Sequence, residues 1–153
     1  MLADILRGYN REDPAKVLQT EVREFDVNSK LKLFIGLPGT GFCSRVLSYS
    51  DLSVNAQDKI HMYDLLVDVD FVNGMAVYKD TPFIKAMKEG KIFVVDNLQL
   101  CSENLVRVFE YVTTHDKFEI EDNINNIHVA IDINPEFRIF ATVIPSAYDA
   151  VIK

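Results

Sequence analysis

A short glycine-rich segment, residues 36–43, constrains the fold more than any other part of this 153-residue sequence. It follows a compact apolar run at 31–35 and leads into a helix-compatible stretch at 44–47. In a strand, turn and helix of this kind, backbone N–H groups and the helix N-terminus cradle phosphate. The sequence therefore predicts a phosphate-binding loop, which comprises Gly36, Leu37, Pro38, Gly39, Thr40, Gly41, Phe42 and Cys43.

The spacing of Gly36 and Gly41 matches the nucleoside-triphosphate loop G-x-x-x-x-G-K-[ST], but the two working side chains do not. Phe42 stands where a lysine would reach the β- and γ-phosphates, and Cys43 stands where a hydroxyl would bind Mg²⁺. Backbone dipoles remain, so ATP or ADP with Mg²⁺ is expected to bind weakly or not at all. A tight turn that serves backbone geometry alone is the alternative. We expect the Phe42 ring to fold over the loop.

The rest of the chain alternates between strand and helix signals. Strands are predicted at 31–35, 51–55, 91–96 and 137–144. Helices are predicted directly after the glycine loop, at 81–90 and at 103–113, and hairpins are predicted at 70–78 and 118–131. The first hairpin has Asn73-Gly74 at its turn, which tolerates the positive φ angles of a type I′ turn. Thr81 is a good N-cap for the second helix, and Gly90 can take its left-handed C-terminal position.

Strands that alternate with helices imply an α/β fold with a mostly parallel sheet, flanked by helices and carrying hairpin inserts. Ligands of such sheets bind at the carboxyl ends of the strands. Asp96 closes the strand at 91–96, so we expect it at the same edge as the glycine loop. Residues 1–30, with a short helix opened by Pro14, are interpreted as a lead-in segment to an α/β core at 31–153.

Composition excludes several classes of function. The formal charge of −7 argues against direct binding of nucleic acid, which requires clustered Lys and Arg. No apolar run approaches the roughly 20 residues of a membrane-spanning helix, and no signal peptide is recognisable. Cys43 and Cys101 have no metal-ligand spacing, and His61, His115 and His128 lie in different elements, so no zinc site is expected.

Several segments, taken in order, carry a family resemblance. The glycine loop and the apolar strand closed by Asp96-Asn97 occupy the places of the two triphosphate motifs of an AAA+ ATPase with a P-loop core. Residues 63–66 (Tyr-Asp-Leu-Leu), 78–86 (Tyr-Lys-Asp-Thr-Pro-Phe-Ile-Lys-Ala) and 137–142 (Phe-Arg-Ile-Phe-Ala-Thr) resemble motifs of the dynein-related branch. In that branch they read Tyr-Asp-Leu-Leu-Gly, Trp-x-Asp-Gly-Pro-Leu-x-Lys-Ala and Phe-Arg-Leu-Phe-Ala-Thr. The resemblance covers about residues 31–145.

This resemblance implies an AAA+ core fold in a module that works within a ring of six. The members most similar to this chain act in the nucleus, where they strip assembly factors from precursors of the large ribosomal subunit. The implied partners are therefore other AAA+ modules in a ring and protein clients of ribosome assembly, with no direct nucleic acid and no membrane. Only eight residues follow Pro145, so the helical lid of the family is expected to be absent from this chain.

The sequence departs from the family pattern at its catalytic positions. Asn97 replaces the catalytic glutamate, and an amide cannot act as a general base for water. Ile144 replaces a polar sensor, and Asp96 would hold Mg²⁺ only weakly. Arg138 is expected to be a structural ion-pair partner and not a catalytic finger. We therefore expect no hydrolysis by this chain alone. Two alternatives stay open: an active site completed by neighbouring modules, and a scaffold that binds protein through its hairpins without nucleotide.

Overall fold

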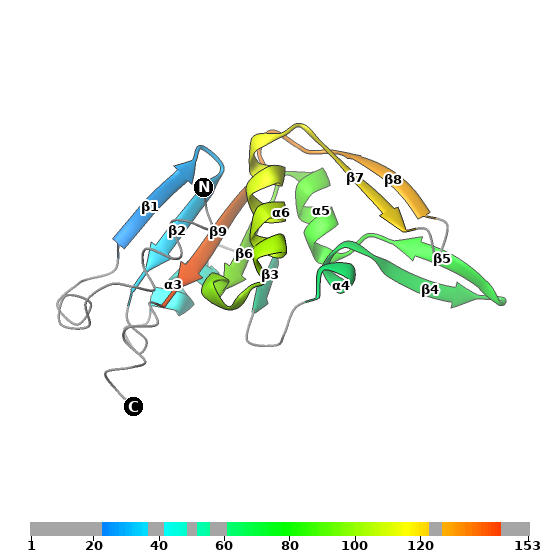
Figure 1. Ribbon diagram of the computed structural model, residues 1–153, viewed down its shortest axis with the longest axis horizontal. Helices are drawn as coiled ribbons and strands as arrows, with labels where there is room; N and C mark the ends of the chain where they lie inside the picture. The colour runs from blue at the N-terminus through cyan, green and yellow to red at the C-terminus, as the bar shows by residue number, and fades with distance from the viewer. Residues whose placement is uncertain (1–22, 37–41, 49–51, 56–60, 123–126, 145–153) are drawn as a thin grey trace, which may run out of the picture.

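The computed structural model describes residues 23–36, 42–48, 52–55, 61–122 and 127–144. At its centre is a five-stranded sheet with the order β1-β2-β9-β6-β3 (Figure 1). The strands are β1 (Arg23–Asn28), β2 (Leu31–Ile35), β3 (Leu52–Asn55), β6 (Ile92–Asp96) and β9 (Arg138–Val143). β2, β9, β6 and β3 are parallel, and β1 is antiparallel to β2. The predicted α/β fold with a mostly parallel sheet is confirmed.

Strand β1 lies within the segment that the sequence analysis interpreted as a lead-in, and it forms one edge of the sheet. Its outward charges are matched by its neighbour, because the Lys32 ammonium lies 3.5 Å from Glu24 and 3.8 Å from Asp26. Charged side chains on an edge strand discourage pairing with a further chain. The short helix expected from Pro14 falls outside the part of the chain that the structure describes.

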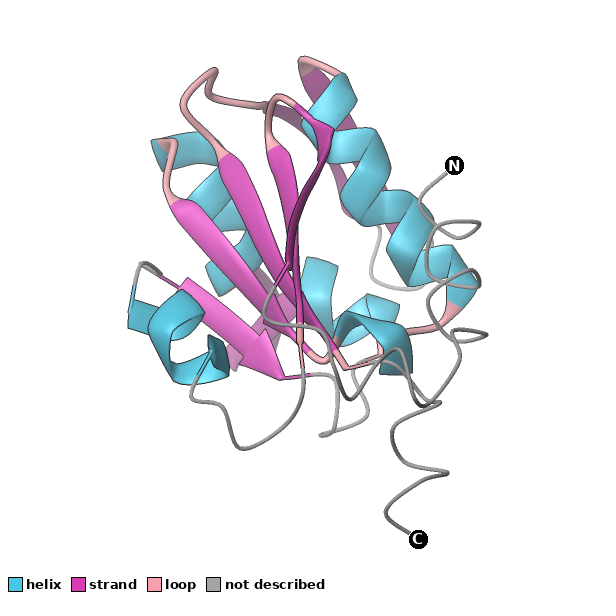
Figure 2. Cartoon of the chain, turned by 90° about the vertical axis from the view of Figure 1, so that its left-hand side faces the viewer, coloured by secondary structure: helices cyan, strands magenta, loops and turns pink. Residues whose placement is uncertain are grey.

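Helices lie on both sides of the sheet (Figure 2). Because successive strand residues point to opposite faces, β2 sends Leu33 toward the main core and Phe34 toward a smaller one. Helices α5 (Pro82–Glu89) and α6 (Glu103–Thr114) contribute to the main core, and α3 (Phe42–Ser48) to the smaller one. None of the described helices is long and apolar enough to cross a membrane.

The main core is centred on Phe83 of α5. Its ring centroid lies 5.1 Å from that of Phe93 in β6 and 5.6 Å from that of Phe109 in α6, distances that favour aromatic contact. Leu105 and Val112, on the same face of α6 as Phe109, are fully buried. The apolar stripe predicted for this helix is therefore part of the core, and it anchors the helices against the strands that carry the site.

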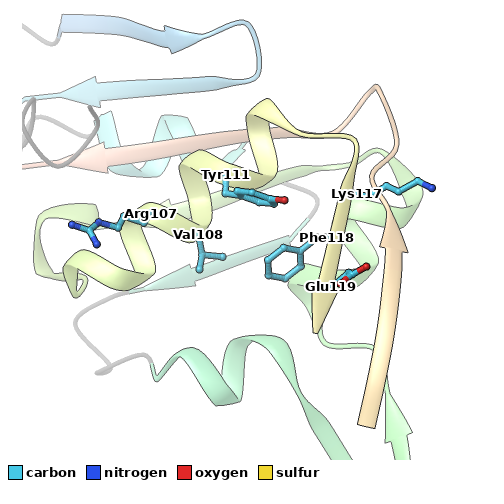
Figure 3. Close-up of a pocket in the computed structure, with 6 residues that line it drawn as sticks. All are labelled: Arg107, Val108, Tyr111, Lys117, Phe118 and Glu119. Atoms are coloured by element: carbon cyan, nitrogen blue, oxygen red, sulfur yellow. The ribbon is translucent and has the colours of Figure 1, made fainter. Parts of the chain in front are cut away.

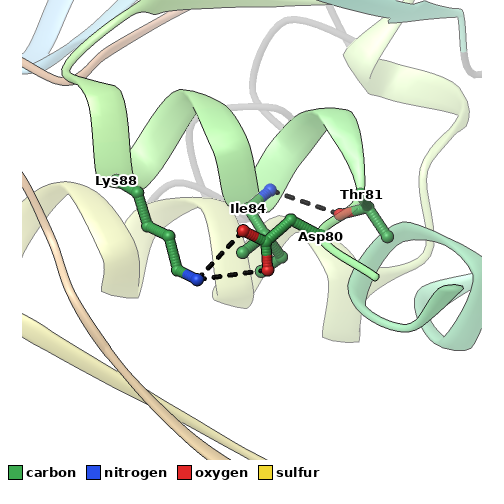
Figure 4. A network of polar contacts seen from close by, with 4 residues as sticks. All are labelled: Asp80, Thr81, Ile84 and Lys88. Atoms are coloured by element: carbon green, nitrogen blue, oxygen red, sulfur yellow. Dashed lines mark hydrogen bonds and ion pairs between the residues drawn. The ribbon is translucent and has the colours of Figure 1, made fainter. Parts of the chain in front are cut away.

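Helix α5 begins and ends where the sequence predicted. The Thr81 hydroxyl accepts a hydrogen bond from the Ile84 N–H at 3.2 Å, and Gly90 takes the left-handed conformation with φ of 72°. The Lys88 ammonium reaches back along the helix to both oxygens of Asp80, at 3.0 and 3.1 Å (Figure 4). Because these signals are all local, the boundaries of this helix can be predicted from the sequence alone.

Both predicted hairpins are present. The first has strands β4 (Asp68–Val72) and β5 (Met75–Lys79) and follows the short helix α4 (Met62–Leu66); the second has β7 (Lys117–Asp122) and β8 (Ile127–Asp132). The turn of the first hairpin has positive φ at both Asn73 (53°) and Gly74 (77°), which is the type I′ geometry. The β4–β5 hairpin extends away from the sheet, so it is an arm of the molecule and not part of the strand edge (Figure 1).

Candidate functional site

The strand and the helix expected on either side of the glycine loop are present, and the strand ends at the carboxyl edge of the sheet. Strand β2 ends at Ile35, the Gly36 N–H donates to the Val143 carbonyl at 3.2 Å, and α3 begins at Phe42. Residues 37–41, which supply Leu37, Pro38, Gly39, Thr40 and Gly41, lie outside the described residues, as do the side chains of Phe42 and Cys43. The predicted cover of the loop by the Phe42 ring therefore stays a prediction.

Asp96 lies at the same edge, at the end of β6, with β9 between it and β2. Its buried carboxylate accepts a hydrogen bond from the hydroxyl of Thr142, a fully buried residue of β9. The same hydroxyl oxygen accepts a bond from the backbone N–H of Asn97 at 2.9 Å. A threonine hydroxyl has a single proton, so here it goes to the carboxylate. Asp96 thus acts as the acceptor at the end of a two-bond relay inside the protein.

Asn97 has the left-handed conformation, with φ of 63° and ψ of 50°, and caps the 3₁₀ turn η2 (Leu98–Leu100). Among residues with a side chain, asparagine tolerates this region better than glutamate does, because its short amide can hydrogen-bond locally. Its amide oxygen accepts from the Gln99 Nε2 at 3.4 Å. Asn97, which the resemblance aligns with the catalytic glutamate, is therefore suited to the backbone turn, and its amide has no proton-accepting pKa in range.

Gln99 joins the turn after β6 to the end of β9. Its Oε1 accepts a hydrogen bond from the Ile144 N–H at 3.2 Å, while its Nε2 donates to Asn97. The Ile144 side chain is half-buried and packs on the smaller core with Val94 and Phe140. At the expected sensor position the chain thus presents an apolar side chain, and its backbone amide is already bonded to Gln99.

The remaining candidates lie elsewhere or do not cluster. Arg138 begins β9, at the end of the sheet opposite Asp96. Its guanidinium donates hydrogen bonds to the backbone carbonyls of Pro135 and Phe137, both at 2.8 Å. The expected structural role is therefore present, but the partners are backbone oxygens and not the carboxylate of an ion pair. Burial raises the pKa of the Cys101 thiol to about 12, so this cysteine is not a nucleophile at neutral pH. Among the described residues, no three or more His, Cys, Asp or Glu side chains are grouped to hold a metal ion.

Sequence reasoning identified Asp96 and Asn97 but missed Thr142 and Gln99, which hold them in place. Residues 96 and 142 meet only through the parallel register of β6 and β9, in which Val95 pairs with Ala141. One sequence signal was available for the turn, because an asparagine directly after a buried strand is a candidate for the left-handed region. No comparable local signal marks Thr142 or Gln99 as its partners.

A comparison with known protein families supports the same fold. Residues 33–150 match the family described as AAA domain (dynein-related subfamily). The match starts within β2, before the glycine loop, and includes Asp96, Asn97 and Thr142, so it spans the whole candidate site and well over half of the chain. The chain belongs to the dynein-related subfamily of AAA domain proteins.

Proposed function

We propose that this chain is an AAA module of the midasin kind, which takes part structurally in a ring of AAA modules and does not hydrolyse ATP at its own site. The observation that carries the proposal is the relay from Asn97 through Thr142 to Asp96. It engages the acidic residue of the second triphosphate motif in a buried structural bond. The neighbouring position carries an amide in place of a base.

The donor set does not fit a catalytic Mg²⁺–triphosphate complex. Mg²⁺ prefers oxygen ligands in octahedral geometry, and the loop offers the sulfur of Cys43 where a hydroxyl is needed. Phe42 supplies no cation for the phosphates, and Asn97 no base for water. Phosphoryl transfer depends on such groups to position the reactants and to stabilise the charge of the phosphates. The three substitutions therefore remove three separate requirements of the reaction: the metal ligand, the cation and the base. We derive no catalytic step for this chain.

The larger role rests on the resemblance of residues 95–101 (Val-Asp-Asn-Leu-Gln-Leu-Cys) and 137–142 (Phe-Arg-Ile-Phe-Ala-Thr) to motifs of midasin. Midasin strips assembly factors from precursors of the large ribosomal subunit in the nucleus. The partners would be other AAA modules and protein clients of ribosome assembly. The net charge of −7 makes direct contact with RNA unfavourable, so we expect the ribosomal precursor to be reached through protein. A module that keeps the AAA fold but does not hydrolyse ATP would serve as a structural member of the ring between modules that do.

The test is steady-state release of phosphate from Mg-ATP by the parent chain, with Asp96→Ala as the control. We expect no release above a protein-free blank for either chain. A second measurement, the melting temperature with and without Mg-ATP, reports binding without turnover. Phosphate release by the parent that disappears in Asp96→Ala would refute the proposal. Stabilisation by Mg-ATP without release would favour a binding module that neighbours complete.

The alternative of a nucleotide-independent protein scaffold is favoured by one observation, the exposed apolar side chains on the β4–β5 hairpin. If the chain is a scaffold only, its melting temperature will not change with ATP or ADP at millimolar concentration. The double variant Phe42→Lys/Cys43→Thr, which restores the family residues of the loop and leaves the left-handed Asn97 unchanged, tests the loop itself. Nucleotide binding gained by this variant would show that the loop backbone is still competent.

A further inference from the structure

The turn of the β4–β5 hairpin contains an amide side chain that can react with its own backbone. Asn73 is followed directly by Gly74, and both residues are exposed at the far end of the arm in Figure 1. Glycine has no side chain to shield its backbone nitrogen, and a Cβ built at Gly74 would meet nothing within 4 Å. The Gly74 nitrogen is therefore accessible to water and to the side chain of the residue before it.

The closed turn does not have the geometry for this reaction. In a type I′ turn, which is the mirror image of type I, the first central residue has ψ of about +30°. At this ψ the Gly74 nitrogen lies on the opposite side of the Cα–C bond from the Asn73 side chain, so it cannot reach the side-chain carbon. The turn has to open before the two groups meet, and the free energy of opening therefore controls the rate.

Opening at the end of this arm disturbs little of the fold. Residues 71–77 are all exposed, and in the described part of the chain β4 and β5 pair only with each other. The arm is held at its base, where Val69 and Tyr78 pack against the main core. Because a two-stranded hairpin without further support is only marginally stable, its end can open while the base and the central sheet stay folded.

The β7–β8 hairpin, by contrast, is supported along its length. The Phe118 ring of β7 lies 6.1 Å from that of Tyr111 in α6, with Val108 beside them (Figure 3). Ile120 and Ile131, one on each strand, are buried in the main core. No side chain between residues 71 and 77 of the first hairpin is buried. The end of the β4–β5 hairpin is therefore the less restrained of the two.

We propose that Asn73 is a site of spontaneous deamidation in the folded protein, and that opening of the turn at Asn73-Gly74 controls the reaction. The Gly74 nitrogen gives its proton to a base in the solvent and attacks Cγ of Asn73. The bond from Cγ to the side-chain nitrogen breaks, and this nitrogen takes up a proton and leaves as ammonia. The product is a five-membered imide. Water then adds to one of the two imide carbonyl carbons and breaks its bond to the Gly74 nitrogen, so water is the only other reactant.

The two ways of opening the imide give different products. Breakage at the side-chain carbonyl gives aspartate with the original backbone. Breakage at the backbone carbonyl gives isoaspartate, in which the backbone passes through the former side chain and is one carbon longer. A two-residue turn cannot accept the extra atom and keep the register in which Val72 pairs with Met75. Both products also add a carboxylate to an arm in which Asp68 and Asp70 already outnumber Lys79.

The chain contains an internal control in Asn28, which is followed by the small residue Ser29 in the β1–β2 turn. Its Nδ2 donates a hydrogen bond to Thr113 Oγ1 at 3.0 Å, and its Oδ1 accepts one from the Lys30 N–H at 2.8 Å. Both ends of this amide are held, and the bonds must break before its Cγ can be attacked. We therefore expect deamidation of Asn28 in the folded chain to be at least about tenfold slower than that of Asn73.

The experiment is incubation of the folded chain at mildly alkaline pH in water labelled with heavy oxygen, beside a sample in urea. Digestion at acidic pH in ordinary water follows, so that conversion during handling carries no label, and mass spectrometry compares the peptides with residues 28 and 73. In the folded parent we expect residue 73 to take up one heavy oxygen, with isoaspartate among the products as detected by an isoaspartyl methyltransferase. In urea the two sites should become more similar, because Asn28 has lost its bonds.

The variant Asn73→Gln is the matched control for the site. Its side chain would have to close a six-membered ring, which forms less readily than a five-membered one, so the fast reaction at residue 73 should disappear while the slow reaction at Asn28 is unchanged. A fast reaction that persists elsewhere in the same peptide of this variant would show that Asn73 is not the reacting residue.

Three other results would overturn the proposal. Residue 73 could stay unlabelled in the folded chain while it converts in urea, which would mean that the turn does not open. The ratio of conversion at residues 73 and 28 could be the same with and without urea, which would place the reaction in the globally unfolded chain. Labelled product without isoaspartate would indicate direct hydrolysis of the side chain. The proposal does not depend on the nucleotide site, so a failure here and a failure of the proposed function are separate results.

Discussion

Substitution of Thr142 by valine tests the relay that holds the second motif together. Valine has nearly the shape of threonine, so the packing of β9 should be kept while the hydroxyl is lost. The carboxylate of Asp96 would then lose its bond from residue 142, and the N–H of Asn97 would lose its acceptor. Thr142, Asp96 and Asn97 are all buried, so water cannot easily replace these bonds.

The expected loss can be worked out from the two bonds. A hydrogen bond to a charged group contributes about 1.5–3 kcal/mol, and a buried N–H without a partner costs about 1–3 kcal/mol. The two terms share one hydroxyl and are not fully additive, so we expect a decrease of about 3 kcal/mol in the free energy of unfolding. In a domain of this size that corresponds to a melting temperature lower by about 6–12 °C.

The assay is thermal and urea unfolding of Thr142→Val beside two controls. Thr142→Ser keeps the hydroxyl and loses one methyl group, so it should cost only about 1 kcal/mol. In an Asp96→Ala background the valine substitution should cost less than in the parent, because the acceptor is already gone. A Thr142→Val chain that melts within about 1 °C of the parent would refute the reasoning, since two buried bonds cannot be lost at so small a cost.

Three further predictions follow from single contacts. Gly90→Ala should lower the free energy of unfolding more than Gly74→Ala in urea titrations, although both glycines have positive φ, because a Cβ at 90 would lie 2.6 Å from Asn134 Oδ1 and a Cβ at 74 would meet nothing within 4 Å. Tyr78→Phe should match or exceed the parent in stability at pH 7, because the buried Tyr78 hydroxyl has no hydrogen-bond partner among the described residues. Burial also raises the pKa of Tyr78 above 10, so the folded state keeps a proton that the unfolded state loses, and the parent should lose stability relative to Tyr78→Phe as the pH rises past 10. Cys101, with its pKa raised by burial to about 12, should react slowly with a thiol-specific disulfide reagent at pH 8 in the folded chain and quickly in urea.

Each of these predictions has a clear contrary result. Equal losses in the two glycine variants would mean that the close approach of Asn134 relaxes without cost. A Tyr78→Phe chain less stable than the parent at pH 7 would show that the hydroxyl has a partner, such as ordered water. Labelling of Cys101 at the same rate in the folded and unfolded chain, followed by mass spectrometry, would show that its burial is not maintained in solution.

The elements that could be predicted from sequence are those whose signals are local. Asn73-Gly74 determined the first hairpin because only a few residues accept two positive φ angles in succession. Thr81 and Gly90 fixed the ends of α5 for similar reasons, since a capping side chain and a left-handed residue act within one helical turn. In each case the residue type and the required backbone geometry are found at the same position in the chain.

The parts that could not be predicted depend on residues distant in sequence or on weak strand signals. Thr142 meets Asp96 across 46 residues, and this contact exists only in the observed strand register. Strand β1 contains Glu24 and Asp26, and acidic residues are depleted in strands, but Phe25 and Val27 alternate with them, which is a strand signal that the sequence analysis did not use. The sequence analysis could therefore name the acidic residue of the site, but not the hydroxyl that holds it.

The position of β9 in the sheet has a consequence for how the chain folds during synthesis. β9 is the last strand that the structure describes, yet it lies between β2 and β6, and Leu31 of β2 pairs with Ile139. The two hairpins can form from neighbouring residues as they emerge, but β2 must wait through about 100 further residues, or about 5–20 s of translation. During that time β2 and β6 each have an open apolar edge that could pair with another chain. The nascent protein should therefore depend on chaperones until β9 emerges, and truncations that end before residue 138 should aggregate and not merely lose stability.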